Sequence, residues 1–118
     1  MSEIAPNIDN KKALDEFFKT ISKINTELNK PGIDSKFTVP EHQEKLKEYR
    51  LRLKKCVDTD RNKIAADLVN QLEQNEKGFE DGIKAINQEI QEINDTVDFL
   101  DILGRTINTI EKIVHVVI

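Results

Sequence analysis

The chain contains 118 residues with a single cysteine, and its 22 acidic and 18 basic side chains give a net charge of −4. One cysteine excludes an intrachain disulfide framework, and the length suits one domain spanning residues 1–118. No apolar run approaches the roughly 18 residues of a membrane-spanning helix, and no signal-peptide pattern is visible, so we expect a cytoplasmic protein.

The composition favours helices. The chain has only three Pro, four Gly, five Phe and one Tyr, and it lacks Trp. Disorder is the competing interpretation for a chain with 34% charged residues, but the net charge is small and apolar residues recur with a helical period. We therefore predict an all-α fold, either an antiparallel helical bundle or a coiled-coil-like hairpin of three to five helices with long helices.

The first helix follows a loose N-terminal arm, which we place at residues 1–8. Asp9 or Asn10 can cap this helix. Its apolar positions recur every three or four residues: Leu14, Phe17, Phe18, Ile21, Ile24 and Leu28. The helix is predicted to end near Asn29, because Lys30-Pro31-Gly32 is a strong stop signal.

Residues 30–40 are predicted to form an inter-helix loop. Its apolar members are expected to fold back on the bundle: Ile33, Phe37 and Val39. The next helix is predicted to start here as well, with Thr38 as its cap, Pro40 in its first turn and Glu41 completing a capping box.

The second long helix has an apolar face made by four residues: Leu46, Tyr49, Leu53 and Val57. Cys56 lies beside this face, and we interpret it as a half-buried structural residue rather than a reactive thiol. Three capping residues in a row, Asp58-Thr59-Asp60, favour a break over one continuous helix. Helix is then expected to resume and to reach Lys77, where Gly78 can end it. The alternative is a single helix from near Asp60 past Leu100.

The most regular apolar pattern lies in the C-terminal third. Steps of four and three residues connect Phe79, Ile83, Ile86, Ile90, Ile93, Val97 and Leu100. This alternation predicts a coiled-coil seam on one helix. A shifted continuation follows at Leu103, Ile107, Ile110, Val114 and Val117. Because the shift coincides with Gly104, we predict a possible joint at residue 104, where a helix kinks or ends.

Charge is unevenly distributed. Residues 41–63 carry eight Lys or Arg against five Asp or Glu, and residues 64–103 carry two against ten. The two segments are therefore expected to pack as antiparallel neighbours, with their opposite charges biasing the register.

No residue pattern predicts catalysis. His42 and His115 each lack a second metal ligand at suitable spacing, and no phosphate-binding glycine loop is present. The paired acids Glu89/Glu92 and Asp95/Asp98 lack the Glu-x-x-His motif of a di-metal bundle. We expect no enzyme activity, no cofactor, no metal and no small-molecule substrate.

The sequence instead favours a non-enzymatic protein-interaction module that self-associates. The apolar stripes exceed what a thin hairpin can cover, and a large uncovered stripe normally meets a partner. We therefore expect a homodimer or a higher homo-oligomer, formed through the seam residues named above.

Two alternatives remain open. A membrane-active, pore-forming or cell-death bundle would release its C-terminal amphipathic segment, residues 97–118, although this segment lacks the basic face of an interfacial helix. A weak nucleic-acid binder would use the basic face within residues 45–55, where Lys47, Arg50 and Lys54 share one side.

Overall fold

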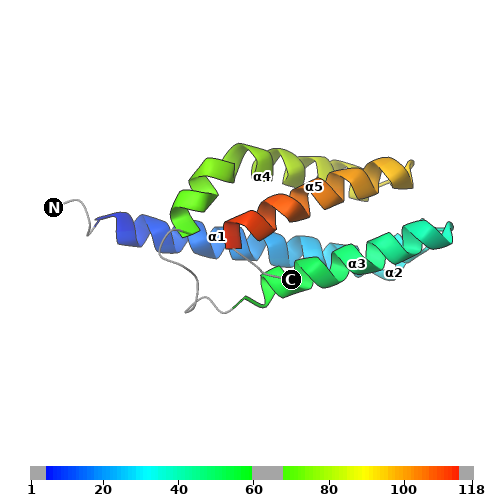
Figure 1. Ribbon diagram of the computed structural model, residues 1–118, viewed down its shortest axis with the longest axis horizontal. Coiled ribbons are helices and arrows are strands. Elements are labelled where there is room, and N and C mark those ends of the chain that lie inside the picture. Colours follow the sequence, from blue (N-terminus) through cyan, green and yellow to red (C-terminus); the bar gives the residue numbers. More distant parts are fainter. Residues whose placement is uncertain (1–4, 60–67, 115–118) are drawn as a thin grey trace.

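The computed structural model describes residues 5–59 and 68–114, which form five helices and confirm the all-α bundle (Figure 1). The helices are α1 (Ala5–Leu28), α2 (Pro31–Asp34), α3 (Pro40–Val57), α4 (Leu68–Ile90) and α5 (Thr96–Val114). The four long helices form two antiparallel hairpins, α1/α3 and α4/α5, in an elongated molecule of 56 × 26 × 20 Å. Residues 5–8, expected in the loose arm, belong to α1.

The two hairpins pack so that α1 lies on α4 and α3 lies on α5. Within each of these two pairs the helices run in the same direction (Figure 1). Going around the bundle, the order is α1, α3, α5, α4, so α3 is diagonal to α4. The part of the acidic segment that lies on α4 is therefore not a direct neighbour of α3, and the part that lies on α5 packs on α3 in a parallel rather than an antiparallel direction.

The first hairpin closes largely as the sequence predicts. Its helix α1 ends at Leu28, and the short helix α2 interrupts the predicted loop. Ile33 and Phe37 are buried as expected. Val39, in contrast, is 43% exposed, because it is the residue that precedes the first turn of α3. It takes the cap position predicted for Thr38, and no side chain caps the helix.

Arg50 joins the two helices of this hairpin. Its Nε donates a hydrogen bond of 2.8 Å to the carbonyl oxygen of Leu28, and its Nη1 lies 2.7 Å from an Asp34 carboxylate oxygen. The carbonyl groups in the last turn of a helix lack intrahelical partners and carry partial negative charge. A cation from α3 thus stabilises the C-terminal end of α1.

The α4–α5 turn corrects the prediction of one continuous seam. Helix α4 ends at Ile90, and α5 begins only at Thr96. Asp95 caps α5, because its Oδ1 accepts the backbone N–H of Asp98 at 3.1 Å. The side chain thereby satisfies one of the free N–H groups at the helix start, which favours a new helix over a continued one. Ile93 stays buried within the turn.

Neither Gly78 nor Gly104 ends a helix. Both lie inside continuous helices, α4 and α5. Gly104 permits close packing instead: a Cβ placed there would lie 2.6 Å from the hydroxyl oxygen of Tyr49 on α3. Gly82 serves the same purpose on α4, where an added Cβ would overlap the side chain of Thr106 on α5. The predicted break after Val57 does occur, since Asp58 is the C-cap of α3.

Helix α5 is the most buried helix of the bundle. Nine of its residues are buried: Phe99, Leu100, Leu103, Gly104, Thr106, Ile107, Ile110, Ile113 and Val114. This broad face results from contacts with α3 on one side and α4 on the other. The core continues through α1 at the predicted apolar positions, from Phe17 to Leu28.

Candidate functional site

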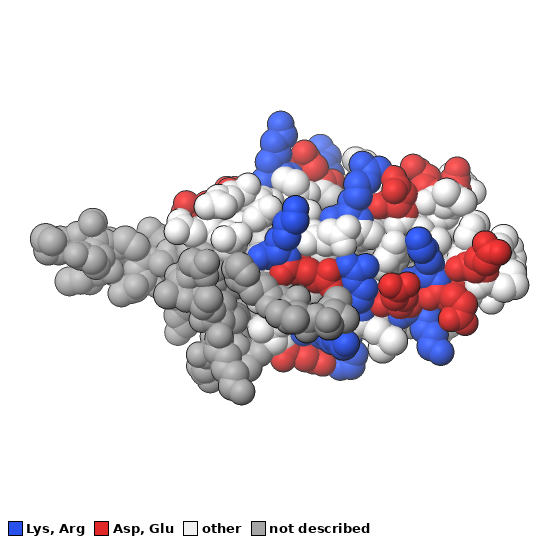
Figure 2. All heavy atoms as spheres, viewed as in Figure 1, with Lys and Arg blue, Asp and Glu red and all other residues white. Residues whose placement is uncertain are grey.

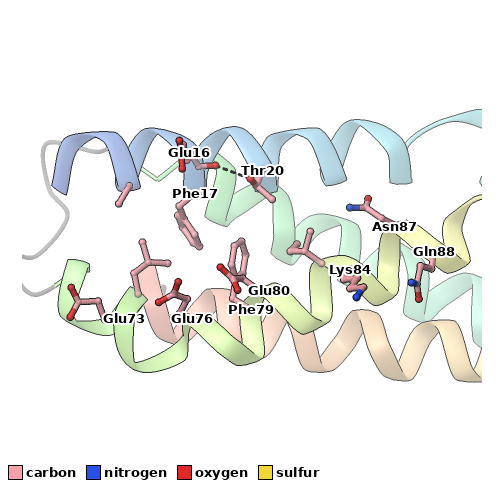
Figure 3. Close-up of a pocket in the computed structure, with 13 residues that line it drawn as sticks. Glu16, Phe17, Thr20, Glu73, Glu76, Phe79, Glu80, Lys84, Asn87 and Gln88 are labelled. Carbon is pink, nitrogen blue, oxygen red and sulfur yellow. Dashed lines mark hydrogen bonds between the residues drawn. The ribbon is translucent and has the colours of Figure 1, made fainter. Parts of the chain in front are cut away.

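A groove with a volume of about 710 Å³ lies between the middle of α1 and most of the length of α4 (Figure 3). The α1 wall is formed by Ala13, Glu16, Phe17 and Thr20. The α4 wall is formed by Leu72, Glu73, Glu76, Phe79, Glu80, Ile83, Lys84, Asn87 and Gln88. The groove exists because α4 packs mainly on α5 and only secondarily on α1.

Two aromatic rings form the floor of the groove. The Phe17 and Phe79 ring centroids are 5.0 Å apart, with the ring planes tilted by 48°. In Figure 3 one ring extends from α1 and the other from α4. Leu72 and Ile83 extend the apolar surface along α4, and both are half-buried. This surface can bind apolar side chains of a partner.

The rim of the groove is acidic. Glu73, Glu76 and Glu80 lie on successive turns of α4, and Glu16 lies on the opposite wall. Lys84 is the one basic residue among the lining residues that the structure describes. The ion pairs between described residues all lie elsewhere in the bundle. The rim therefore presents negative charge to an approaching partner.

The predicted seam residues occupy three environments. Buried members are Phe79, Ile86, Ile93, Leu100, Leu103, Ile107, Ile110 and Val114. Ile83 and Ile90 are partly buried against the core. Val97 is 60% exposed, because the capped start of α5 changes the direction of its side chain. Val117 lies outside the described residues.

Phe99 and Ile113 are core residues that the seam pattern omitted, since both are 0% exposed. The seam pattern assumes that one helix continues through residues 91–95. Helix α5 instead begins anew at its cap, so a different set of its positions faces the core. The turn-forming run Asn94-Asp95-Thr96, with Asp98 three residues after Asp95, is the signal that could have revealed this start.

The groove itself was not predicted. Its sequence signal is the row Glu73, Glu76 and Glu80 beside the apolar positions Leu72, Phe79 and Ile83. The sequence shows that this segment is acidic, but its charge predicts pairing with the basic segment rather than a groove. Only the diagonal placement of α3 and α4 leaves these carboxylates without that partner.

Three basic side chains of α3 make contacts within the chain. Arg50 binds the end of α1, and Lys54 forms a 2.7 Å ion pair with Asp58. Arg52 reaches α5, where its Nε donates to Glu111 at 3.0 Å and its Nη2 to Asn108 at 2.6 Å. Figure 2 shows acidic and basic side chains interleaved on the face that it presents, rather than a continuous basic area.

His42 and Cys56 lie near opposite ends of α3 and have separate surroundings. His42 Nδ1 lies 2.9 Å from Thr96 Oγ1, a contact that joins the starts of α3 and α5. Cys56 is fully buried, and this burial raises the pKa of its thiol to about 12, so the reactive thiolate is disfavoured. Among residues 5–59 and 68–114, no three His, Cys, Asp or Glu side chains group as a metal site would require.

Glu89 is the carboxyl with a perturbed environment. Partial burial, then a hydrogen bond with Asp98 and the negative charges of Asp98 and Asp95, raise the pKa of Glu89. Its Oε2 atom is buried without a hydrogen-bond partner. These groups meet at the α4–α5 turn, far along α4 from the acidic rim.

No helix in the described residues has the length and apolar character needed to cross a membrane. Comparison of the chain with family models, curated proteins and solved structures finds no match. The functional assignment therefore depends on the geometry of this chain.

Proposed function

We propose that this chain is a non-enzymatic helical protein-interaction module, and that the groove between α1 and α4 is its interaction surface. The observation that carries the proposal is the groove of about 710 Å³ between two helices, in which the half-buried side chains of Leu72 and Ile83 lie beside the buried rings of Phe17 and Phe79. A concave apolar surface with polar groups at its edge is the common form of a binding site.

The groove takes the place of the seam as the partner-binding surface. Self-association was expected because the apolar stripes exceeded what a hairpin can cover. The second hairpin supplies the missing cover, and the buried seam residues pack within one chain. A dimer built on those residues would have to open the bundle, which would expose core side chains to water.

The same consideration bears on the two alternatives. Release of α5 toward a membrane would expose nine buried residues, and α5 contacts both α3 and α4. Binding of phosphate groups by α3 would compete with the contacts of Arg50 to Leu28 and Asp34.

Site-specific crosslinking in the cells that produce the protein tests this function. A photoreactive amino acid would replace Thr20 on the α1 wall or Asn87 on the α4 wall. The exposed residue Lys47 on α3, which does not line the groove, is the control position. We expect the groove positions to crosslink one protein that the control does not. If neither position yields a product above the control, the groove is not an interaction surface. A product made of two copies of the chain would restore self-association.

A further inference from the structure

We infer that the groove binds a basic amphipathic helix of a partner protein, with its apolar face on the half-buried Leu72 and Ile83 of α4 and its Lys or Arg side chains at the acidic rim. The inference rests on the proposed function and specifies the chemistry of the partner. Three properties of the groove support it: its length, its apolar floor and the sign of its charge.

The α4 wall of the groove matches a helix of moderate size. This wall runs from Leu72 to Gln88, which is roughly 24 Å at a rise of about 1.5 Å per residue, whereas the α1 wall from Ala13 to Thr20 covers roughly 10 Å. A partner helix of about 16 residues has the length of the α4 wall and lies between both walls for about two turns. Such a helix places apolar side chains on one face at intervals of three and four residues, which is how helices occupy hydrophobic grooves.

The floor provides separate contacts for those apolar side chains. Leu72, Phe79 and Ile83 follow one another along α4 at intervals of seven and four residues. Phe17 contributes from α1 at the level of Phe79. Leu72 and Ile83 are half-buried, so their remaining surface can contact successive apolar anchors of a bound helix. The rings of Phe17 and Phe79 are only 3% and 7% exposed, so they support this surface from the core.

The charge of the rim selects the kind of helix. Carboxylates line both walls, with Glu73, Glu76 and Glu80 on α4 and Glu16 on α1, against the single ammonium of Lys84. Complementary potentials speed association and exclude wrong partners, because like charges placed together are repelled. A helix with Lys or Arg on both flanks of its apolar face satisfies this arrangement, and an acidic helix does not.

A second copy of the chain fits the groove poorly. In a symmetric dimer the same surface meets itself, so the four carboxylates of one copy would face those of the other. An anionic lipid surface would be repelled for the same reason. These two occupants are therefore outcomes that the experiment must distinguish from a basic helix.

The test uses two synthetic 18-residue peptides and the full chain labelled with ¹⁵N. Both peptides carry Leu on one helical face, and they differ only in having Lys or Glu on the flanks. We expect the Lys peptide to shift the amide resonances of groove residues such as Thr20, Phe79 and Ile83. We expect the Glu peptide to bind at least about tenfold more weakly, and the Lys peptide to bind more weakly as salt is raised.

Charge reversal of the rim provides the second arm. The variant Glu76→Lys/Glu80→Lys should weaken binding of the Lys peptide by about tenfold or more. The matched control Asp81→Lys/Glu92→Lys changes the net charge equally, but these two exposed residues do not line the groove. It should weaken binding by less than about threefold. Circular dichroism and thermal unfolding of each variant establish that the bundle is retained.

Several results would overturn the inference. Equal binding of the Glu and Lys peptides would show that the rim does not select charge, and shifts confined to α3 and α5 would place the peptide elsewhere. Binding of the free chain to phosphatidylserine vesicles, or a dimer whose formation shifts the groove resonances, would identify a different occupant. A crosslinked partner at Thr20 together with no binding of the Lys peptide would retain the proposed function and reject the basic helix. Binding of the Lys peptide in the groove without a crosslinked partner would support the chemistry and reject the function.

Discussion

Two glycines on neighbouring turns of α4 have opposite relations to their surroundings. Gly82 faces Thr106 of α5 so closely that an added Cβ would lie 2.9 Å from the Thr106 Cγ2 atom. A Cβ added at Gly78 would lie 4.0 Å from the nearest Thr109 side-chain atoms, which is an ordinary van der Waals distance. The first glycine is therefore required for helix packing, and the second only weakens the helix.

Alanine substitution should separate these two roles. Gly82→Ala should destabilise the bundle by about 1–3 kcal/mol, because it forces α4 away from α5. Gly78→Ala should stabilise it by about 0.5–1 kcal/mol through helix propensity. Urea unfolding followed by circular dichroism measures both changes.

A rescue variant checks the cause of the Gly82 effect. Thr106→Ala removes the atoms that the new Cβ would meet, so Gly82→Ala should cost less in that background than in the wild type. Equal costs in the two backgrounds would contradict the packing explanation.

Individual side chains also decide what could be predicted about the groove. The spacing of Phe79 and Ile83 predicted correctly that they belong to an apolar stripe. It could not say that Phe79 meets Phe17, because that contact joins residues far apart in the chain. The spacing of apolar residues shows which residues share one face of a helix. A groove depends in addition on which helices lie side by side.

At the scale of helices, the α3–α5 contact combines tight packing with a partly buried ion pair. The side chains of Arg52 and Glu111 are 20% and 13% exposed, and two nitrogens of Arg52 reach both oxygens of the carboxylate. Hydrogen bonding to Glu111 raises the pKa of Arg52 against the opposing effect of burial. These helices run in parallel, so the pair contributes to their axial register.

Removing one partner of this pair should be costly. Arg52→Met leaves the Glu111 carboxylate largely buried without its cation, and we expect a loss of about 2 kcal/mol in the free energy of unfolding. Arg105→Met is the control, because its pair with Asp101 is 73% and 59% exposed and should contribute less than about 0.5 kcal/mol. Chemical denaturation measures both, and equal losses would mean that burial of the pair does not matter.

The helices themselves could be predicted better than their junctions. The stop at Lys30-Pro31-Gly32 and the break after Val57 are both confirmed. The turn before Thr96 was missed because Ile93 continues the seam in sequence while the backbone has left the helix. A strict apolar period is compatible with one long helix and with two helices joined by a turn of suitable length, and the cap at Asp95 decides between them.

At the scale of the whole molecule, acidic groups at the α4–α5 turn link folding to pH. The pKa of Glu89 is raised above the ordinary value of 4.5 by burial and by Asp98 and Asp95. A carboxyl whose pKa is higher in the folded state binds its proton more tightly there. Its contribution to stability is therefore fully present below pH 4.5 and is lost as the pH rises through the raised value.

The variant Glu89→Gln should remove this dependence. Its amide can donate to Asp98 at every pH, so the variant should become increasingly more stable than the wild type as the pH rises from about 4.5 to 7. Thermal unfolding across this range measures the difference in Tm. Glu92→Gln removes a charge from an exposed carboxyl at the same turn, and it separates a general charge effect from that of Glu89. A difference in Tm that shrinks with rising pH would contradict the expected sign.

The sequence could not predict how the two hairpins pack on each other. Apolar stripes on α1, α3, α4 and α5 require a shared core, but they do not specify which pairs are neighbours and which are diagonal. That choice depends on the fit at Gly82 and Gly104, where only the three-dimensional contacts show the small residue and its large partner together. It also determines which carboxylates are left to face solvent.

The groove lies between α1 and α4, and these helices belong to different hairpins. A ligand bound there would contact both hairpins and would add to the existing contact between α1 and α4. Its binding energy would then oppose separation of the hairpins and raise Tm as its concentration exceeds its dissociation constant. By reciprocity, any change that separates α1 from α4 would weaken binding of the ligand.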